Sequence, residues 1–302
     1  MLDIALVGTG GMMPMPDRFL ASMMIRFNGR LIMVDCGEGA QISLKMLGWG
    51  FKAIDAIFIT HFHADHVSGL PGILLTIGNA GRIEPIKIIG PAGITKIVEG
   101  LRCIFPELPY KLEFIEIDDT DITLDFDDMN INVCEGDHKI RCLAYKFNIP
   151  RKGRFSVEKA QSLDIPVKMW SVLQKGESVE YNDKIYTSDM VLGDERKGLT
   201  ISYCTDTRPV DDFVEFIQDS DLFICEGMYG ENEKKEKAKE YKHMIFSEAA
   251  TLAKKGNVKE LWLTHLSPSM SKPNEFIDNA TEIFENTKIG YDRMTTTLHF
   301  ND

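Results

Sequence analysis

The chain has 302 residues, of which 44% are hydrophobic, and a net charge of −12. This length can bury a large core, as one α/β domain or two smaller ones. No apolar run approaches the ~20 residues that a membrane-spanning helix needs. The negative charge argues against nonspecific wrapping of nucleic acid.

The six cysteines are scattered and form no Cys-x-x-Cys motif. They therefore indicate neither a disulfide framework nor a thiolate zinc site. Residues 1–7 lack the basic start of a signal peptide and are predicted to form a strand. We expect a cytoplasmic protein with no membrane partner. A homodimer is the expected assembly.

Short β-rich runs alternate with helical ones, which predicts a layered α/β fold. Strands are expected at 22–27 and 31–35, on either side of Asn28-Gly29, the strongest short hairpin signal. A helix is expected at 39–47 and a buried strand at 54–60. The later expected elements are strands at 200–204, 221–225 and 260–264 and one long helical stretch at 234–255.

Residues 148–197 interrupt this alternation, because their hydrophobic periodicity is weak and they contain Pro150, Pro166 and three glycines. Long insertions of this kind in compact domains are usually functional or mobile. Between Lys146 and Lys168 the chain carries six basic residues against two acidic ones. Taken alone, such a run indicates no more than a solvated face.

The most informative motif is His61-Phe62-His63-Ala64-Asp65-His66, directly after the expected strand at 54–60. It places four metal-competent side chains in one loop. Imidazole nitrogens and carboxylate oxygens suit Zn²⁺, with Mn²⁺ and Fe²⁺ as alternatives. The preceding strand and the following Gly-Leu-Pro-Gly exclude an expression tag.

Three more potential ligands share this context, since His138, Asp206 and His265 each follow an apolar strand-like run. The carboxyl ends of strands open into the crevice where α/β folds bind ligands. A structural role is the better interpretation of any one of these residues. Four strand ends with the same arrangement instead favour a metal site.

The pattern His-x-His-x-Asp-His, followed by a lone His, Asp and His, resembles the metallo-β-lactamase superfamily. Finer motifs resemble the ribonuclease Z family of endonucleases, which trim 3′ trailers from precursor tRNA. They include Asp35-Cys36-Gly37-Glu38-Gly39, Thr205-Asp206-Thr207-Arg208-Pro209 and Thr264-His265-Leu266-Ser267. The resemblance covers residues 1–150 and 198–302. It implies a single hydrolase domain over 1–302, built as a four-layer αββα sandwich.

The resemblance also implies two divalent metal ions, most simply Zn²⁺. His61, His63 and His138 would bind one ion, Asp65, His66 and His265 would bind the other, and Asp206 would bridge them. Two cations about 3.5–4 Å apart can activate a shared hydroxide and clamp the oxygens of a phosphoryl displacement. Asp65 would also accept the proton of that hydroxide.

The same resemblance assigns leaving-group protonation to His243, with Glu226 orienting it and raising its pKa. Taken alone, His243 would be a polar residue on a charged helix. The family motifs His-Glu-Ala-Thr and His-x-Thr read Cys225-Glu226-Gly227-Met228 and His243-Met244-Ile245 here. The charged pair is present and the hydroxyl residues are not. A phosphate oxygen must therefore be bound differently here than in proteins with the family motifs.

The insertion at about 148–197 occupies the position of the family's exosite arm, which holds tRNA. Bacterial relatives carry a Gly-Pro-rich turn in that arm, where this chain reads 164-DIPVKM-169. Basic residues in its first half would suit phosphate contacts that position a substrate without reading its sequence. Precursor tRNA is therefore the expected substrate.

Three alternatives stay open at this point. The nearest is a hydrolase of the same fold acting on a small phosphodiester or thioester, which would need no arm. A diiron oxidoreductase would show His-x-Glu-x-Asp and a flavodoxin-like domain for which 302 residues leave no room. A noncatalytic RNA-binding module would hold structural zinc in a closed, four-coordinate site.

Overall fold

The computed structural model describes residues 1–105, 107–119, 122–126 and 128–300. The chain divides into two compact units. Of the described residues, Met1–Asn148 and Thr200–His299 form unit 1, and Ile149–Leu199 with Phe300 form unit 2. No helix in the described part of the chain is long and apolar enough to cross a membrane.

The first sheet of unit 1 has seven strands among the described residues, in the order β16-β1-β2-β3-β4-β5-β6. Its N-terminal strands are antiparallel, whereas β3 to β6 run parallel. The strands are β1 (Leu2–Gly8), β2 (Ser22–Phe27), β3 (Arg30–Val34), β4 (Ile54–Phe58), β5 (Ile86–Pro91), β6 (Leu112–Ile117) and β16 (Thr295–Leu298).

The predicted hairpin at Asn28-Gly29 is confirmed. Phe27 pairs with Arg30, so the loop has two residues. Both loop residues have positive φ, 49° at Asn28 and 79° at Gly29. A type I′ turn requires this conformation, and it matches the twist of the flanking strands.

The second sheet also has seven strands in the described part of the chain, in the order β15-β14-β13-β12-β9-β8-β7. Strands β12 to β15 are parallel, so their carboxyl ends meet at one edge. The strands are β7 (Thr123–Phe126), β8 (Met129–Glu135), β9 (Leu143–Arg151), β12 (Arg196–Cys204), β13 (Leu222–Glu226), β14 (Leu261–Thr264) and β15 (Thr287–Ile289).

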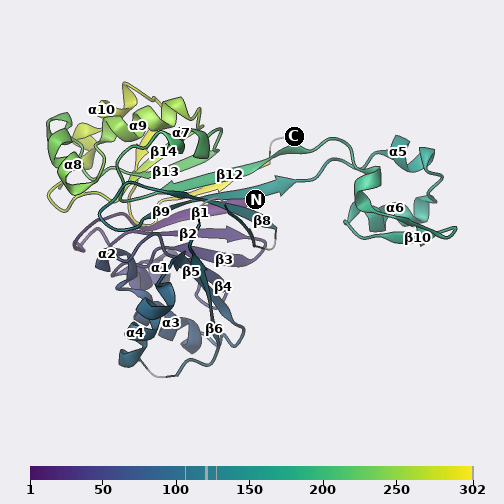
Figure 1. Ribbon diagram of the computed structural model, residues 1–302, viewed down its shortest axis with the longest axis horizontal. Helices are drawn as coiled ribbons and strands as arrows, with labels where there is room; N and C mark the ends of the chain where they lie inside the picture. The colour runs from purple at the N-terminus through teal and green to yellow at the C-terminus, as the bar shows by residue number, and fades with distance from the viewer. Residues whose placement is uncertain (106, 120–121, 127, 301–302) are drawn as a thin grey trace. The chain divides into compact units, whose positions relative to one another are not determined.

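The two sheets face each other, and helices cover their outer faces (Figure 1). Between the sheets the ring of Phe58 on β4 meets Tyr145 and Phe147 on β9, at centroid distances of 5.2 and 5.5 Å. The first sheet is covered by α1 (Ala40–Leu47), α3 (Leu70–Asn79) and α4 (Ile94–Leu101). The second is covered by α7 (Asp212–Phe216), α9 (Phe246–Lys255) and α10 (Asp278–Thr281). The predicted αββα sandwich is confirmed.

The prediction of one continuous helical stretch at 234–255 was wrong, because the structure has two separate helices there. Helix α8 (Lys235–Tyr241) ends where Lys242 takes a left-handed φ of 62°, and α9 begins only at Phe246. The break has a physical reason, because α8 buries only Ala238, whereas Met244 and Ile245 after it are buried. The interruption puts His243 in a buried turn and not on an exposed helix.

Unit 2 contains the range that we call the arm, residues 149–199. It holds α5 (Val157–Ser162), α6 (Val167–Gln174) and a hairpin of β10 (Val179–Tyr181) and β11 (Lys184–Tyr186). Its own apolar cluster consists of Ala160, Ile165, Leu173, Tyr186 and Val191. The substrate-binding role of this segment stays a prediction.

Candidate active site

The motif at 61–66 lies at the carboxyl end of β4. This strand is buried and has a neighbouring strand on each side in the first sheet, so its end holds the following loop in place. His61 and His63 lie in the loop after β4, with extended backbone at His63, and the short helix α2 (Ala64–Val67) then carries Asp65 and His66. His61 and His66 are fully buried, and Asp65 is 9% exposed.

The second sheet supplies the other three predicted ligands from the ends of its strands. His138 follows β8, Asp206 follows β12 and His265 follows β14. Asp206 and His265 have φ values of 45° and 54°, a left-handed conformation that is uncommon for residues other than glycine. Such strain costs on the order of 1–3 kcal/mol per residue and collects at functional sites.

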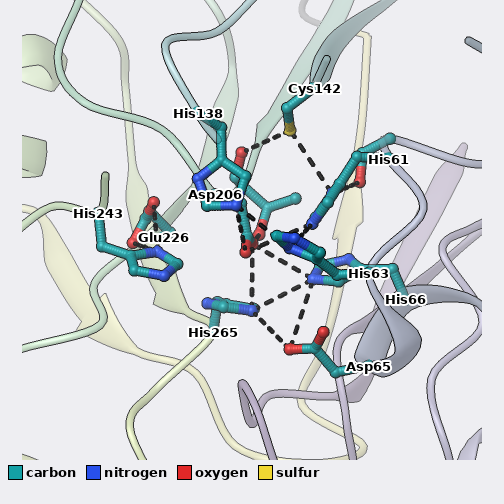
Figure 2. A network of polar contacts seen from close by, with 12 residues as sticks. His61, His63, Asp65, His66, His138, Cys142, Asp206, Glu226, His243 and His265 are labelled. Carbon is teal, nitrogen blue, oxygen red and sulfur yellow. Dashed lines mark hydrogen bonds and ion pairs between the residues drawn. The ribbon is translucent and has the colours of Figure 1, made fainter. Parts of the chain in front are cut away.

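The structure brings all seven residues together (Figure 2). The first set is His61, His63 and His138 with Asp206, and the second set is Asp65, His66 and His265. In the first set, the Nδ1 atom of His63 lies 3.1 Å from Nε2 of His61 and 3.2 Å from Nε2 of His138. In the second, Nε2 of His66 and Nε2 of His265 are 3.2 Å apart. Within each set the potential ligand atoms lie within 4.8 Å of one another.

Asp206 contacts both sets through different oxygens. Its Oδ2 atom lies 3.5 Å from Nε2 of His61 and 3.7 Å from Nε2 of His138. Its Oδ1 atom lies 3.2 Å from Nε2 of His66 and 3.1 Å from Nε2 of His265. One carboxylate therefore stands between the two sets with one oxygen turned to each.

This donor set fits divalent cations. Nδ1 of His63 faces the Nε2 atoms of both His61 and His138 at 3.1–3.2 Å, and one ring nitrogen offers either one N–H or one lone pair, so it cannot form a good hydrogen bond with each of them, whereas the lone pairs of all three nitrogens can point at one cation. A cation between them would satisfy these lone pairs, and a mixed nitrogen and oxygen set suits Zn²⁺, Mn²⁺ or Fe²⁺. The described residues can therefore hold divalent metals.

Outer contacts fix the rings of these histidines. Asp35 Oδ2 lies 2.8 Å from Nδ1 of His66, and the backbone N–H of Thr60 donates to the other oxygen of Asp35 at 2.8 Å. Nδ1 of His138 lies 3.0 Å from the carbonyl oxygen of Lys242. Such partners orient metal-binding imidazoles and select their tautomers. Asp35 thus orients the ring of His66.

The electrostatics favour the metal-binding protonation states of His63 and Asp206, whereas the charges of Asp206 and Asp35 outweigh burial at His66 and raise its pKa well above the ordinary value. Burial, with smaller effects from His61 and His138, lowers the pKa of His63 to about 4. Burial alone would raise the pKa of Asp206, but His265, His66 and His61 hold it well below its usual range. His63 is therefore neutral and Asp206 ionised at neutral pH, as metal ligation requires.

His243 and Glu226 form a buried pair beside the cluster. Glu226 ends β13, and its Oε2 atom lies 3.1 Å from Nδ1 of His243. Glu226 also accepts hydrogen bonds from the backbone N–H groups of Thr207 and Met244, at 2.5 and 3.1 Å. Burial alone would lower the pKa of His243, but the charge of Glu226 outweighs it and raises that pKa to about 9.

A cavity of about 460 Å³ opens in front of these groups. His63, Asp65, His138, Asp206 and His265 line it, and so does His243. Members of both sets of potential metal ligands and the ring of His243 therefore border the same cavity. A ligand in this cavity can meet both.

Sequence reasoning missed several residues around this space. Arg208 donates to the backbone carbonyl of His243 and forms a two-point pair with Glu248, at 2.5 and 2.9 Å. It thereby fixes the turn that carries His243. Arg208 lies in a motif noted above, but no local signal pointed to its partner. The cavity is also lined by Lys139, Tyr229, Lys237 and Tyr241, which no motif indicated.

Comparison with known proteins places this geometry in a class. The structure resembles the metallo-β-lactamase fold protein YhfI from Bacillus subtilis, with a TM-score of 0.69, 17% identity and 98% of each chain covered. It also resembles the short form of human tRNase Z, with a TM-score of 0.71 and 23% identity over 99% of this chain and 100% of that one. The chain therefore has the metallo-β-lactamase fold.

Ribonuclease Z from Clostridium acetobutylicum is 54% identical to this chain, over 100% of both proteins. The chain therefore belongs to the ribonuclease Z family and is a metal-dependent endoribonuclease, as predicted. A family model described as anti-Pycsar protein Apyc1 matches residues 2–98, less than half of the chain. The expected gap in the resemblance at about 150–198 was wrong, because the similarity covers the whole chain, the arm included.

Proposed function

We propose that this chain cleaves precursor tRNA at its 3′ end and releases the trailer. The observation that carries the proposal is one cavity lined by members of both sets of potential metal ligands and by His243, whose ring Glu226 contacts from the buried side. The chain's relatives at 48–54% identity are ribonuclease Z proteins. Hydrolysis of a phosphodiester needs both a nucleophile and a proton donor for the leaving oxygen, and the cavity offers candidates for both.

We assign one metal to His61, His63 and His138 and a second to Asp65, His66 and His265, with Asp206 between them. The opposed ring nitrogens and the divided oxygens of Asp206 support this assignment. When bound, two divalent cations polarise a phosphoryl oxygen and lower the pKa of water. Zinc is the proposed metal, because four-coordinate imidazole and carboxylate sites suit it.

Asp65 is the proposed proton acceptor for the attacking water. Its Oδ2 atom accepts a hydrogen bond from the backbone N–H of Met12 at 2.6 Å and lies 3.4 Å from Nε2 of His265. These contacts hold the carboxylate at the cavity wall. Positioned carboxylates of this kind serve as general bases.

His243 is the proposed proton donor to the departing 3′ oxygen. A pKa of about 9 keeps its ring protonated at neutral pH. Glu226 holds the Nδ1 side, which leaves Nε2 to face the substrate. Water attack then breaks the bond between phosphorus and the 3′ oxygen, and the products are a 3′-hydroxyl and a 5′-phosphate.

The hydroxyl residues of the two family motifs are absent from this chain, so another group must bind the phosphate oxygen. Met228 and Met244 are fully buried, so their side chains do not offer polar groups to the cavity. Ser267 and Ser269 line it instead, with their hydroxyl oxygens 2.8 Å apart. We propose that these hydroxyls grip a phosphate oxygen.

The arm is the proposed tRNA-binding element. Within unit 2, Lys152, Arg154 and Arg196 line one hollow of about 420 Å³, together with Gln174 and Phe155. Three cations around one hollow suit the phosphate backbone of RNA, which positions a substrate without reading its sequence.

Assembly and location are further parts of this proposal. Ile42 and Met46 on α1 are 58% and 62% exposed and line a groove of about 550 Å³. This apolar face supports a homodimer, which sedimentation measurements would detect. The six cysteines, all in the described part of the chain, are free, which suits a reducing cytoplasm.

The direct test is incubation of the purified protein with 3′-extended precursor tRNA, followed by mapping of the product ends. We expect one cut at the base of the trailer, a 3′-hydroxyl on the tRNA and an intact trailer. A ladder of shortened products, or cleavage of small phosphodiesters without any cleavage of the precursor, would contradict the proposal. The second outcome would favour the small-phosphodiester alternative.

A further inference from the structure

One wall of the active-site cavity is formed by residues that the proposed chemistry does not use. They are Lys139, which follows the candidate ligand His138, Tyr229, which lies beyond β13, and Lys237 and Tyr241 on α8. We call these four residues the lysine–tyrosine wall. The wall combines positive charge with aromatic rings, which is the composition of surfaces that bind single-stranded nucleic acid.

The two lysines of the wall differ from the lysines beside them. Lys234, Lys239 and Lys242 each pair with a carboxylate, at 2.5, 2.7 and 2.6 Å. Lys139 and Lys237 have no carboxylate within 4.0 Å among the described residues. In a chain with a net charge of −12, two cations without carboxylate partners at one cavity indicate an anionic ligand.

Each of these lysines instead lies over a tyrosine ring of the wall. The ammonium of Lys139 is 4.7 Å from the ring centre of Tyr241, and that of Lys237 is 5.3 Å from Tyr229. Such cation–π contacts hold an ammonium in place without neutralising it. The positive charge therefore stays available to a phosphate.

The two tyrosines have different exposure. Tyr229 is 4% exposed, and its backbone bonds with Met244 and Phe246 tie it to the turn that carries His243. It can support Lys237 but cannot stack on a ligand. Tyr241 is 42% exposed at the cavity, so its ring can receive a base.

The position of Tyr241 defines which base that would be. Tyr241 ends α8, and His243 follows two residues later. If His243 protonates the departing 3′ oxygen, the nucleotide that carries this oxygen lies next to the same segment. That nucleotide is the one on the 5′ side of the cleaved bond.

We propose that the lysine–tyrosine wall is a nucleotide subsite for the last nucleotide of the mature product. Tyr241 stacks on its base, and Lys139 and Lys237 contact the phosphates on either side of its ribose. This inference rests on the proposed function of His243. In this proposal the wall contributes to RNA binding, whereas the metal ligands and the His243–Glu226 pair carry out the cleavage.

The test of stacking uses Tyr241→Leu and Tyr241→Phe with three precursor tRNAs. One is intact, one lacks the base 5′ of the cut, and one lacks the base 3′ of the cut. Stacking of one base is typically worth about a 5- to 150-fold change in affinity, so Tyr241→Leu should lower kcat/KM on the intact precursor by about fivefold or more. Tyr241→Phe, which keeps the ring, should stay close to the wild type.

The abasic substrates give this test its specificity. On the precursor without the 5′ base, Tyr241→Leu and the wild-type protein should cleave alike, because there is no base to stack. On the precursor without the 3′ base, the loss in Tyr241→Leu should remain. Equal losses on all three substrates would overturn the stacking assignment, and so would no loss on the intact one.

Lys139→Met and Lys237→Met test the phosphate contacts, with Lys234→Met as the matched control. Lys234 also lies over the ring of Tyr229, at 5.8 Å, but it pairs with Glu231 and does not line the cavity. Each wall variant should reduce the slope of log(kcat/KM) against log(salt) by about 0.7, the value for one phosphate contact on a single strand. Lys234→Met should leave the slope unchanged.

The outcomes separate this inference from the proposed function. If the wild-type protein cleaves precursor tRNA but the wall variants match it in rate and salt slope, the subsite is wrong and the proposed function stands. If the wild-type protein does not cleave precursor tRNA, both fail. Cleavage of bis(p-nitrophenyl) phosphate should be unchanged in the control variant Lys234→Met, because Lys234 does not line the cavity.

Discussion

The active-site edge of unit 1 and the arm in unit 2 both carry charged residues, but they hold them differently. At the edge, Asp206, His66 and His265 are at most 2% exposed, and each follows or lies near a buried strand end. In the arm, five buried residues form the apolar cluster, and the cations lie around a surface hollow.

This contrast indicates a division of labour. Chemistry needs groups held within tenths of an ångström, which strands packed in a large core can provide. Backbone contacts to RNA tolerate looser geometry, because their energy comes from charge. We therefore expect changes at the edge to lower turnover and changes in the arm to weaken binding.

Metal removal should have the largest effect. Dialysis against a chelator should abolish cleavage of precursor tRNA and of bis(p-nitrophenyl) phosphate alike, because both reactions need the same edge. Elemental analysis before dialysis should find about two divalent ions per chain, as the two ligand sets require. Full activity with one ion per chain would contradict the two-metal site.

The substitution Asp65→Ala should cause the second largest loss of activity. It removes a proposed ligand and the proposed proton acceptor together, so kcat should fall on the order of 10³-fold or more. The fold should persist, because Asp65 lies on a short helix at the cavity and not in the apolar core. Circular dichroism would check the fold, and cleavage within a few-fold of the wild type would refute the site assignment.

Substitutions at His243 and Glu226 should cost about 10²- to 10⁴-fold in kcat, the usual range for a proton donor. If the two act as one unit, the double alanine variant should be little worse than the poorer single variant. Independent, additive losses would instead mean that the two residues have separate tasks.

The variant Glu226→Gln adds a pH test of the same pair. Without the carboxylate, burial lowers the pKa of His243 from about 9, so its ring loses the proton at a lower pH. The activity of this variant should therefore decline at a lower pH than that of the wild type. An unchanged alkaline limb of the pH profile would exclude His243 as the proton donor.

Replacement of residues 150–195 by a short Gly-Ser linker should have the smallest effect on chemistry. The KM for precursor tRNA should rise about 10- to 100-fold, because several phosphate contacts are lost. Cleavage of bis(p-nitrophenyl) phosphate should hardly change, since the proposed ligands lie outside the deletion.

Charge reversal at Arg151, Lys152 and Arg154 serves as the finer version of this test. It should reproduce part of the KM increase and flatten the salt dependence of binding, while the folded arm remains. A truncated protein that processes precursor tRNA as well as the intact one would remove the arm from the mechanism. The small-phosphodiester alternative would then be preferred.

The sequence by itself determined the local features of this protein. The Asn-Gly hairpin was predictable because two residues with positive φ satisfy one turn type. The gathering of His138, Asp206 and His265 was predictable because each follows an apolar run, and the ends of strands in one sheet can meet at one edge. The pairing of His243 with Glu226 came only from the family resemblance, since nothing in the local pattern joins them.

Only the tertiary structure decided the features that depend on contacts between distant segments. The division of the two Asp206 oxygens between two ligand sets requires five separate strand and helix ends to meet. The break between α8 and α9 depends on the burial of Met244 and Ile245, which outweighs the helical tendency of the charged run before them. That Lys237 and Lys139 have no carboxylate partner is visible only in the tertiary structure. The charge balance of a cavity depends on which residues surround it in three dimensions, and not on their spacing along the chain.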